Sequence, residues 1–84
     1  MPTICQFSGV RIAMFLRGKE HNPPHVHAYY QDFAATFEIA TGELLSGALP
    51  VKAKALVKNF ILQYQLELEE MWETGQYEKL PPVM

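Results

Sequence analysis

The sequence contains a single cysteine, Cys5, among its 84 residues. One cysteine cannot form a disulfide within the chain, which excludes the disulfide-stapled scaffolds of small secreted proteins. Motifs that need two cysteines, such as the redox Cys-x-x-Cys pair, are excluded for the same reason. The cysteine usage therefore predicts a protein of a reducing compartment, the cytoplasm.

Long apolar runs are absent as well, since no stretch approaches the roughly 20 residues that a membrane-spanning helix needs. The first residues, Met1 to Cys5, lack the basic and apolar regions of a signal peptide. No glycine-rich phosphate-binding motif, internal repeat or low-complexity segment occurs. We therefore expect an intracellular protein without a membrane partner.

A strong charge of one sign is also missing, because the formal net charge is −2. Domains that bind nucleic acid are usually basic, so this balance does not favour nucleic acid as a partner. Basic side chains nevertheless gather before residue 20 and at the start of a predicted helix. The candidates for a weak anion or partner site are Arg11, Arg17, Lys19, Lys52 and Lys54.

A chain of 84 residues with 49% hydrophobic side chains is enough for one globular domain. A domain of this size buries only about 60–65% of its unfolded surface, so the core is small, and formation of a homo-oligomer is a common remedy. We expect a sheet and a His-Pro loop in residues 1–49, a long helix in 50–74 and an extended tail in 75–84.

Alternation of apolar and polar residues with a period of two predicts strands. It is clearest in residues 10–17, where Val10 and Ile12 face one way and Arg11 the other. Further strands are predicted at residues 3–7, 25–31 and 34–40, with a short edge strand within 44–49.

Apolar residues repeat at helical spacing after Pro50, a residue that suits the first turn of a helix. The stripe consists of Leu56, Val57, Phe60, Ile61, Tyr64, Leu68, Met71 and Trp72. Gly75 suits a left-handed C-cap, so the helix is predicted to end near Thr74. The fold class that follows is α+β: a small antiparallel sheet of about four strands with one long C-terminal helix packed on one face.

Four segments of the chain resemble one known family. They are Met1-Pro2-Thr3-Ile4, His21-Asn22-Pro23-Pro24-His25-Val26-His27-Ala28-Tyr29-Tyr30, Gly47-Ala48-Leu49-Pro50, and Glu67-Leu68 with Trp72-Glu73. Together they are similar to the small prokaryotic family named domain of unknown function 4160. The resemblance implies no activity, but members are often one half of a two-gene cassette. It therefore implies a toxin–antitoxin-like pair, whose partner is a small protein encoded by a neighbouring gene.

The chain departs from that family at two helix positions. Many relatives carry tryptophan at the position of Phe60 and histidine at the position of Tyr64. A site that used the helix histidine would be incomplete in this chain.

All three histidines lie within residues 21–27, His-Asn-Pro-Pro-His-Val-His. Histidine is the commonest metal ligand. His25 and His27 are two apart, so on a strand they share a face with Cα atoms roughly 6.6 Å apart. A straight polyproline step of about 3.1 Å places His21 roughly 12 Å from His25, so His21 joins them only if the segment turns. With that turn the three histidines could hold a divalent metal such as zinc; otherwise no cofactor is expected.

Two further interpretations use the same segment. In one, a histidine acts as base and another as acid on a phosphodiester, with Tyr29 on the same face. The phosphate is then held by Arg11, Arg17 or Lys19. This would suit a ribonuclease-like toxin. In the other, His25 or His27 donates to a nearby carbonyl or carboxylate and only fixes the loop. A protein-binding surface built from the same loop is the remaining alternative.

The predicted helix starts with Lys52, Lys54 and Lys58 and ends with glutamates, the reverse of what the helix dipole favours. These lysines are either solvated charges or, with the first N–H groups of the helix, a site for an anion or an acidic partner. The small core, the uneven charge and the exposed edge of a short sheet favour protein binding within a toxin–antitoxin-like pair. A histidine-dependent enzyme or metal-binding protein is the alternative, and enzyme activity is the less favoured of the two.

Overall fold

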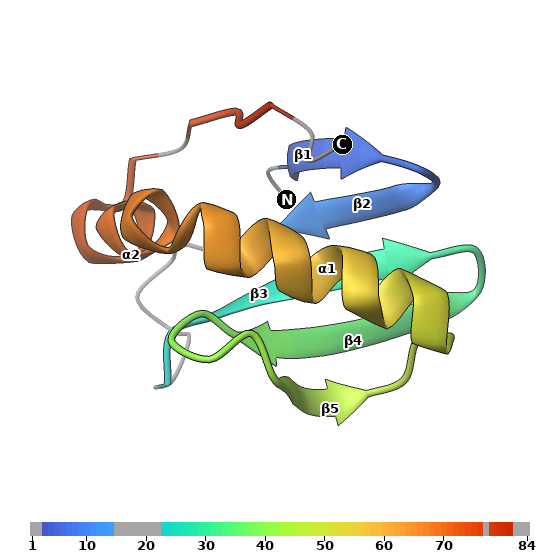
Figure 1. The fold of residues 1–84 in the computed structure, drawn as a ribbon. Helices are drawn as coiled ribbons and strands as arrows, with labels where there is room; N and C mark the ends of the chain where they lie inside the picture. The colour runs from blue at the N-terminus through green and yellow to red at the C-terminus, as the bar shows by residue number, and fades with distance from the viewer. Residues whose placement is uncertain (1–2, 15–22, 77, 82–84) are drawn as a thin grey trace.

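The computed structural model describes residues 3–14, 23–76 and 78–81. Strands in this part of the chain form one antiparallel sheet in the order β1-β2-β3-β4-β5, so neighbours in the sheet are neighbours in the sequence. The strands are β1 (Thr3–Phe7), β2 (Val10–Ala13), β3 (His25–Tyr30), β4 (Phe33–Glu38) and β5 (Leu44–Gly47). Helices α1 (Val51–Gln63) and α2 (Gln65–Thr74) follow and lie over one face of the sheet (Figure 1).

The fold class is α+β, as the sequence predicts, but two details of the prediction are wrong. The described residues contain five strands rather than about four, because the short edge strand expected within 44–49 does form, as Leu44–Gly47, and pairs with β4. The single long helix is two helices, because Tyr64 leaves the helical conformation at φ −112° and ψ 28°. The Nε2 group of Gln65 then donates to the carbonyls of Ile39 and Ala40 at 3.0 and 2.7 Å, which holds the start of α2 against the turn that follows β4.

The strand boundaries differ only slightly from the prediction. The first strand is as predicted, and β3 ends one residue early because Gln31 takes a positive φ of 54° in the turn to β4. The predicted strand over 10–17 appears as Val10–Ala13, and its residues 15–17 lie outside the described part of the chain.

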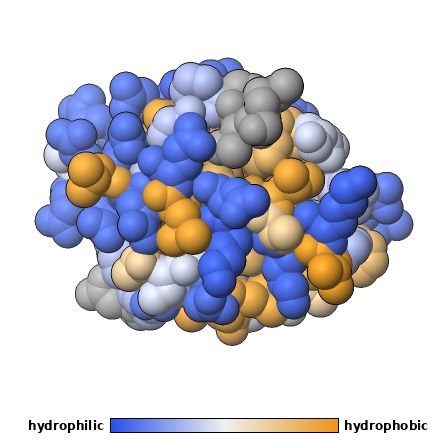
Figure 2. Space-filling model, viewed as in Figure 1, coloured by the Kyte–Doolittle hydropathy of each residue, from blue (hydrophilic) through white to orange (hydrophobic). Residues whose placement is uncertain are grey.

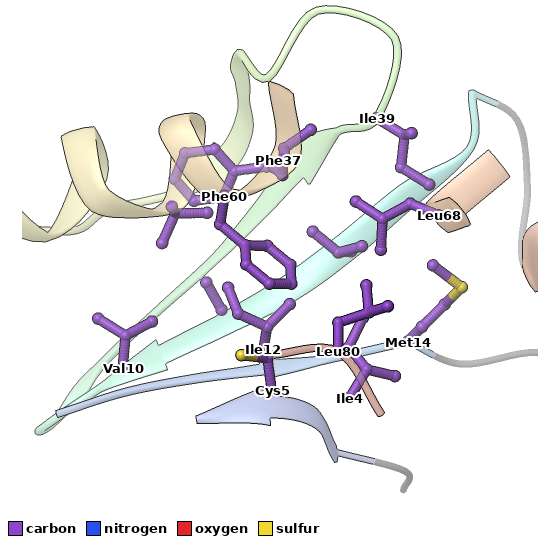
Figure 3. Packing of buried hydrophobic residues seen from close by; sticks show 14 of the residues in the cluster. Ile4, Cys5, Val10, Ile12, Met14, Phe37, Ile39, Phe60, Leu68 and Leu80 are labelled. Carbon is purple, nitrogen blue, oxygen red and sulfur yellow. The ribbon is translucent and has the colours of Figure 1, made fainter. Parts of the chain in front are cut away.

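The core lies between the sheet and the two helices. Alternate strand residues face it, and Val10, Ile12 and Phe37 are almost completely buried. The helical stripe supplies Val57, Phe60, Ile61, Leu68 and Met71. Figure 3 shows the side chain of Phe60 pointing from α1 toward the sheet. Each large apolar side chain buried in this way contributes roughly 1.5–3 kcal/mol, so this layer is the main source of stability.

The two edges of the sheet differ. The described tail after α2 reaches the start of β1 (Figure 1), where the N–H of Leu80 donates to the carbonyl of Ile4 at 2.8 Å and the Leu80 side chain is buried. At the other edge β5 is exposed along its whole length, and no described segment pairs with its outer side. Leu45 has no Cα partner on β4, so it is the extra residue of a β-bulge.

Two glycines are required by their backbone conformation. Gly75 caps α2 as predicted, with a φ of 73° and its N–H donating to the carbonyl of Met71 at 2.9 Å. Gly47 ends β5 with a φ of 81°, and a Cβ there would lie 2.8 Å from the Cα of Ala35. β5 therefore approaches β4 so closely at this point that only glycine fits.

Candidate functional site

The histidine segment enters the described structure at Pro23. His21 lies outside the described residues, as do Arg17 and Lys19, so the hypotheses that need these three side chains stay predictions. His25 and His27 are the first and third residues of β3. The described part of the motif is therefore a histidine pair on a strand.

His25 and His27 share a face of β3, as their spacing predicts. Val26 between them is fully buried in the core, so strand alternation directs the two half-buried histidines to the opposite face. Their ring centroids lie 5.2 Å apart, edge to face at 66°. At this distance one imidazole can act as the base and the other as the acid toward the same bound group.

His25 is tethered at the start of the strand. Its Nδ1–H donates to the carbonyl of Pro23 at 2.9 Å. Because His25 is the first residue of β3, its ring lies at the end of the strand and is also against the ring of Trp72 in α2, with centroids 5.0 Å apart. In the neutral imidazole the lone pair is then on Nε2, so the tether sets both the tautomer and the orientation of the ring. This is a loop-fixing contact of the kind that the sequence offers as one interpretation.

Arg11 and Tyr29 form a second pair on the same face. They lie directly opposite each other in the register of β2 and β3. The guanidinium carbon of Arg11 is 4.6 Å from the Tyr29 ring centroid, and its Nη1 donates to Oγ1 of Thr3 at 3.1 Å. A cation–π contact at a partly exposed site is worth about 0.5–1 kcal/mol. The charge of Arg11 is therefore held on the face that carries the histidine pair.

The described residues alone do not make a metal site. No group of three His, Cys, Asp or Glu side chains among them is placed to hold an ion. His25 and His27 offer two ring nitrogens, whereas zinc takes three or four protein ligands, so a zinc site with His21 stays a prediction. Cys5 is buried in the core, and burial raises the pKa of its thiol, which makes it a poor nucleophile.

The lysines at the start of α1 fall into two groups. Lys58 donates from Nζ to the carboxylate of Glu43 at 2.7 Å, and this hydrogen bond lowers the pKa of Glu43. Lys52 and Lys54 form no close ion pair in the described part of the chain, although the charge of Lys54 also helps to lower the pKa of Glu43. Because α1 also has no side-chain cap and no acidic residue in its first turn, its start carries an excess of positive charge.

A groove that the sequence analysis did not find lies between β5 and the start of α1. It has a volume of about 270 Å³ and is lined by Phe37, Gly42, Glu43, Leu44, Val51, Lys54, Ala55 and Lys58. We call it the β5 groove. The adjacent leucines of the predicted edge strand were a signal for it, but the side to which they point depends on the bulge at Leu45, which no sequence pattern marks.

Comparison with known proteins gives one match. A family model described as domain of unknown function (DUF4160) matches residues 9–73, which confirms the resemblance seen in the sequence. No curated protein and no solved structure matches the chain. Neither described helix is long and apolar enough to span a membrane.

Proposed function

This chain belongs to the DUF4160 family, and we propose that it is the protein-binding component of a toxin–antitoxin-like pair that receives its partner along β5. The partner is the small protein encoded by a neighbouring gene. The pair itself is supported by the family resemblance, and the place of binding is supported by the structure. The observation that carries the proposal is the difference between the two edges of the sheet.

A partner strand can add to a sheet only where an edge is open. At β1 the tail residue Leu80 already bonds to Ile4, so a strand would have to displace the tail. At β5 the exposed residues include Leu44 and Leu45, and Leu44–Gly47 contains no charge and no proline, two of the devices that protect an edge. Strand addition at such an edge gains affinity from backbone hydrogen bonds and specificity from side-chain pockets.

The length of β5 also limits what can bind there. The strand has four residues and a bulge, and both features oppose the open-ended growth of a sheet from copy to copy. The edge therefore suits one short partner strand.

Co-expression with the product of the neighbouring gene tests this function. We expect the two proteins to co-purify, Leu45→Lys to prevent the complex, and Leu66→Lys on α2 to leave it intact. Both leucines are exposed, by 44% and 81%, so either change should alter stability by no more than about 0.5 kcal/mol. The proposal is wrong if the unchanged chain forms no complex, or if Leu45→Lys binds as well as Leu66→Lys.

A second function, acid–base chemistry on a phosphodiester, is favoured by the way His25 is held. The tether to Pro23 fixes the orientation of the His25 ring, which lies against His27, and Arg11 supplies a cation on the same face. RNA cleavage by untagged protein, compared with His25→Ala and His27→Ala, tests this candidate. Cleavage lost in both variants supports it, and an inactive unchanged chain removes it. Metal content should be measured on the same untagged sample, because a histidine tag would add ligands.

A further inference from the structure

The size of the β5 groove indicates what it can hold. Its volume of about 270 Å³ is close to the lower end of the roughly 300–1,000 Å³ range of small-molecule sites. It opens beside an edge strand, where a bound peptide would place alternate side chains toward the core layer and away from it. A groove of this size and position suits one or two side chains of a strand that pairs with β5.

The lining of the groove favours an apolar side chain. Phe37 is buried beneath it, while Leu44 and Val51 on its two sides are exposed by 37% and 79%. Figure 2 shows apolar surface gathered along the lower margin of the molecule, over β5, with hydrophilic side chains above it. Covering these side chains would remove apolar area from water, and each Å² that is buried contributes about 25 cal/mol of favourable free energy.

The charge beside the groove favours a carboxylate. Glu43 is the one acidic residue in the lining, and it already accepts the bond from Lys58. Lys54 also lines the groove; its charge helps to lower the pKa of Glu43, but the close ion pair of Glu43 is with Lys58, and the described residues hold no such close pair for Lys54. The uncapped first turn of α1 adds the positive end of the helix dipole at the same place.

We propose that the partner contributes an acidic and apolar extended segment, which pairs with β5, inserts an apolar side chain into the β5 groove and sets a carboxylate beside Lys54. This inference rests on the proposed function, because it names the chemistry of the partner at the same edge. A second copy of this chain fits poorly, since Leu44–Gly47 contains no acidic residue and the neighbouring Glu43 is occupied by Lys58.

Calorimetric titration of the chain with the product of the neighbouring gene tests the inference. The informative variant is Lys54→Glu, and its matched control is Lys79→Glu, which makes the same charge reversal on the tail at the covered edge. Both lysines are exposed, and circular dichroism of each variant confirms that it is folded. We expect Lys54→Glu to weaken binding by about tenfold or more and Lys79→Glu to change it by less than about twofold. Binding by the unchanged chain should weaken as salt rises from about 0.05 to about 0.5 M.

The outcomes separate the inference from the function on which it rests. Suppose that Leu45→Lys abolishes binding but Lys54→Glu and added salt leave it unchanged. Then β5 is the binding edge, and the inference of an acidic partner segment is wrong. If the unchanged chain does not bind at all, both are wrong. Self-association of the chain that Leu45→Lys abolishes would show that a second copy occupies the edge, and would also overturn the inference. Restoration of Lys54→Glu binding by an acid-to-lysine change in the partner would confirm the contact.

Discussion

The backbone N–H of Leu80 donates a hydrogen bond to the carbonyl oxygen of Ile4 at 2.8 Å. This bond joins the tail to the first strand at Ile4, near the start of β1. The opposite edge, β5, has no such cover in the part of the chain that the structure describes. Since an uncovered edge is the place where a sheet accepts another strand, this difference is the reason that the proposed partner is expected at β5.

The tail should also stabilise the fold. Leu80 is buried against the core, so Leu80→Ala removes apolar contacts and leaves a cavity next to β1. We expect a loss of about 2–3 kcal/mol in the free energy of unfolding, measured by urea denaturation. The exposed Val51→Ala should change it by less than about 0.5 kcal/mol. Equal stability of the two variants would show that the tail does not pack as described.

The contact between His25 and Trp72 gives a spectroscopic prediction. Trp72 is the only tryptophan, so the intrinsic fluorescence reports on this ring pair. His25→Ala should move the emission to longer wavelength, because the indole loses the ring that shields it from water. His27→Ala, which removes a ring that lies against His25, should have a smaller effect. A larger shift in His27→Ala than in His25→Ala is the result that would count against the tether.

The ion pair between Lys58 and Glu43 predicts a pH dependence. Lys58 lowers the pKa of Glu43 below its ordinary value of 4.5, so the folded chain holds this proton more weakly than the unfolded chain does. The stabilisation is therefore complete above the ordinary value and is lost as the pH falls through the lowered one. The difference in melting temperature between the unchanged chain and Glu43→Gln should shrink from about pH 5 to about pH 3. A difference that stays constant over this range would show that the bridge does not form.

Much of the fold follows from local patterns. Alternation placed Val10 and Ile12 in the core, and the αL preference of glycine placed the end of α2 at Gly75. The break at Tyr64 was not predictable, because no proline or glycine marks it. It coincides with the meeting of Gln65 and the carbonyl of Ile39, a contact between residues far apart in the sequence.

The candidate surfaces also combine features that the sequence predicts with features that depend on tertiary packing. The shared face of His25 and His27 follows from a spacing of two on a strand, so the sequence predicts it. The neighbour of that pair, Trp72, comes from the other end of the chain and could be placed only by the packing of α2. The β5 groove depends on the bulge at Leu45 and the position of Val51, which are tertiary features.

The most direct test of the account is amide hydrogen exchange of this chain, read by NMR, before and after addition of the neighbouring gene's product. Binding at the open edge predicts slower exchange and shifted amide signals in Leu44–Gly47, with the amides of β1 unchanged. Protection confined to β1 or to the histidine face of β3, with β5 exchanging as before, would contradict it.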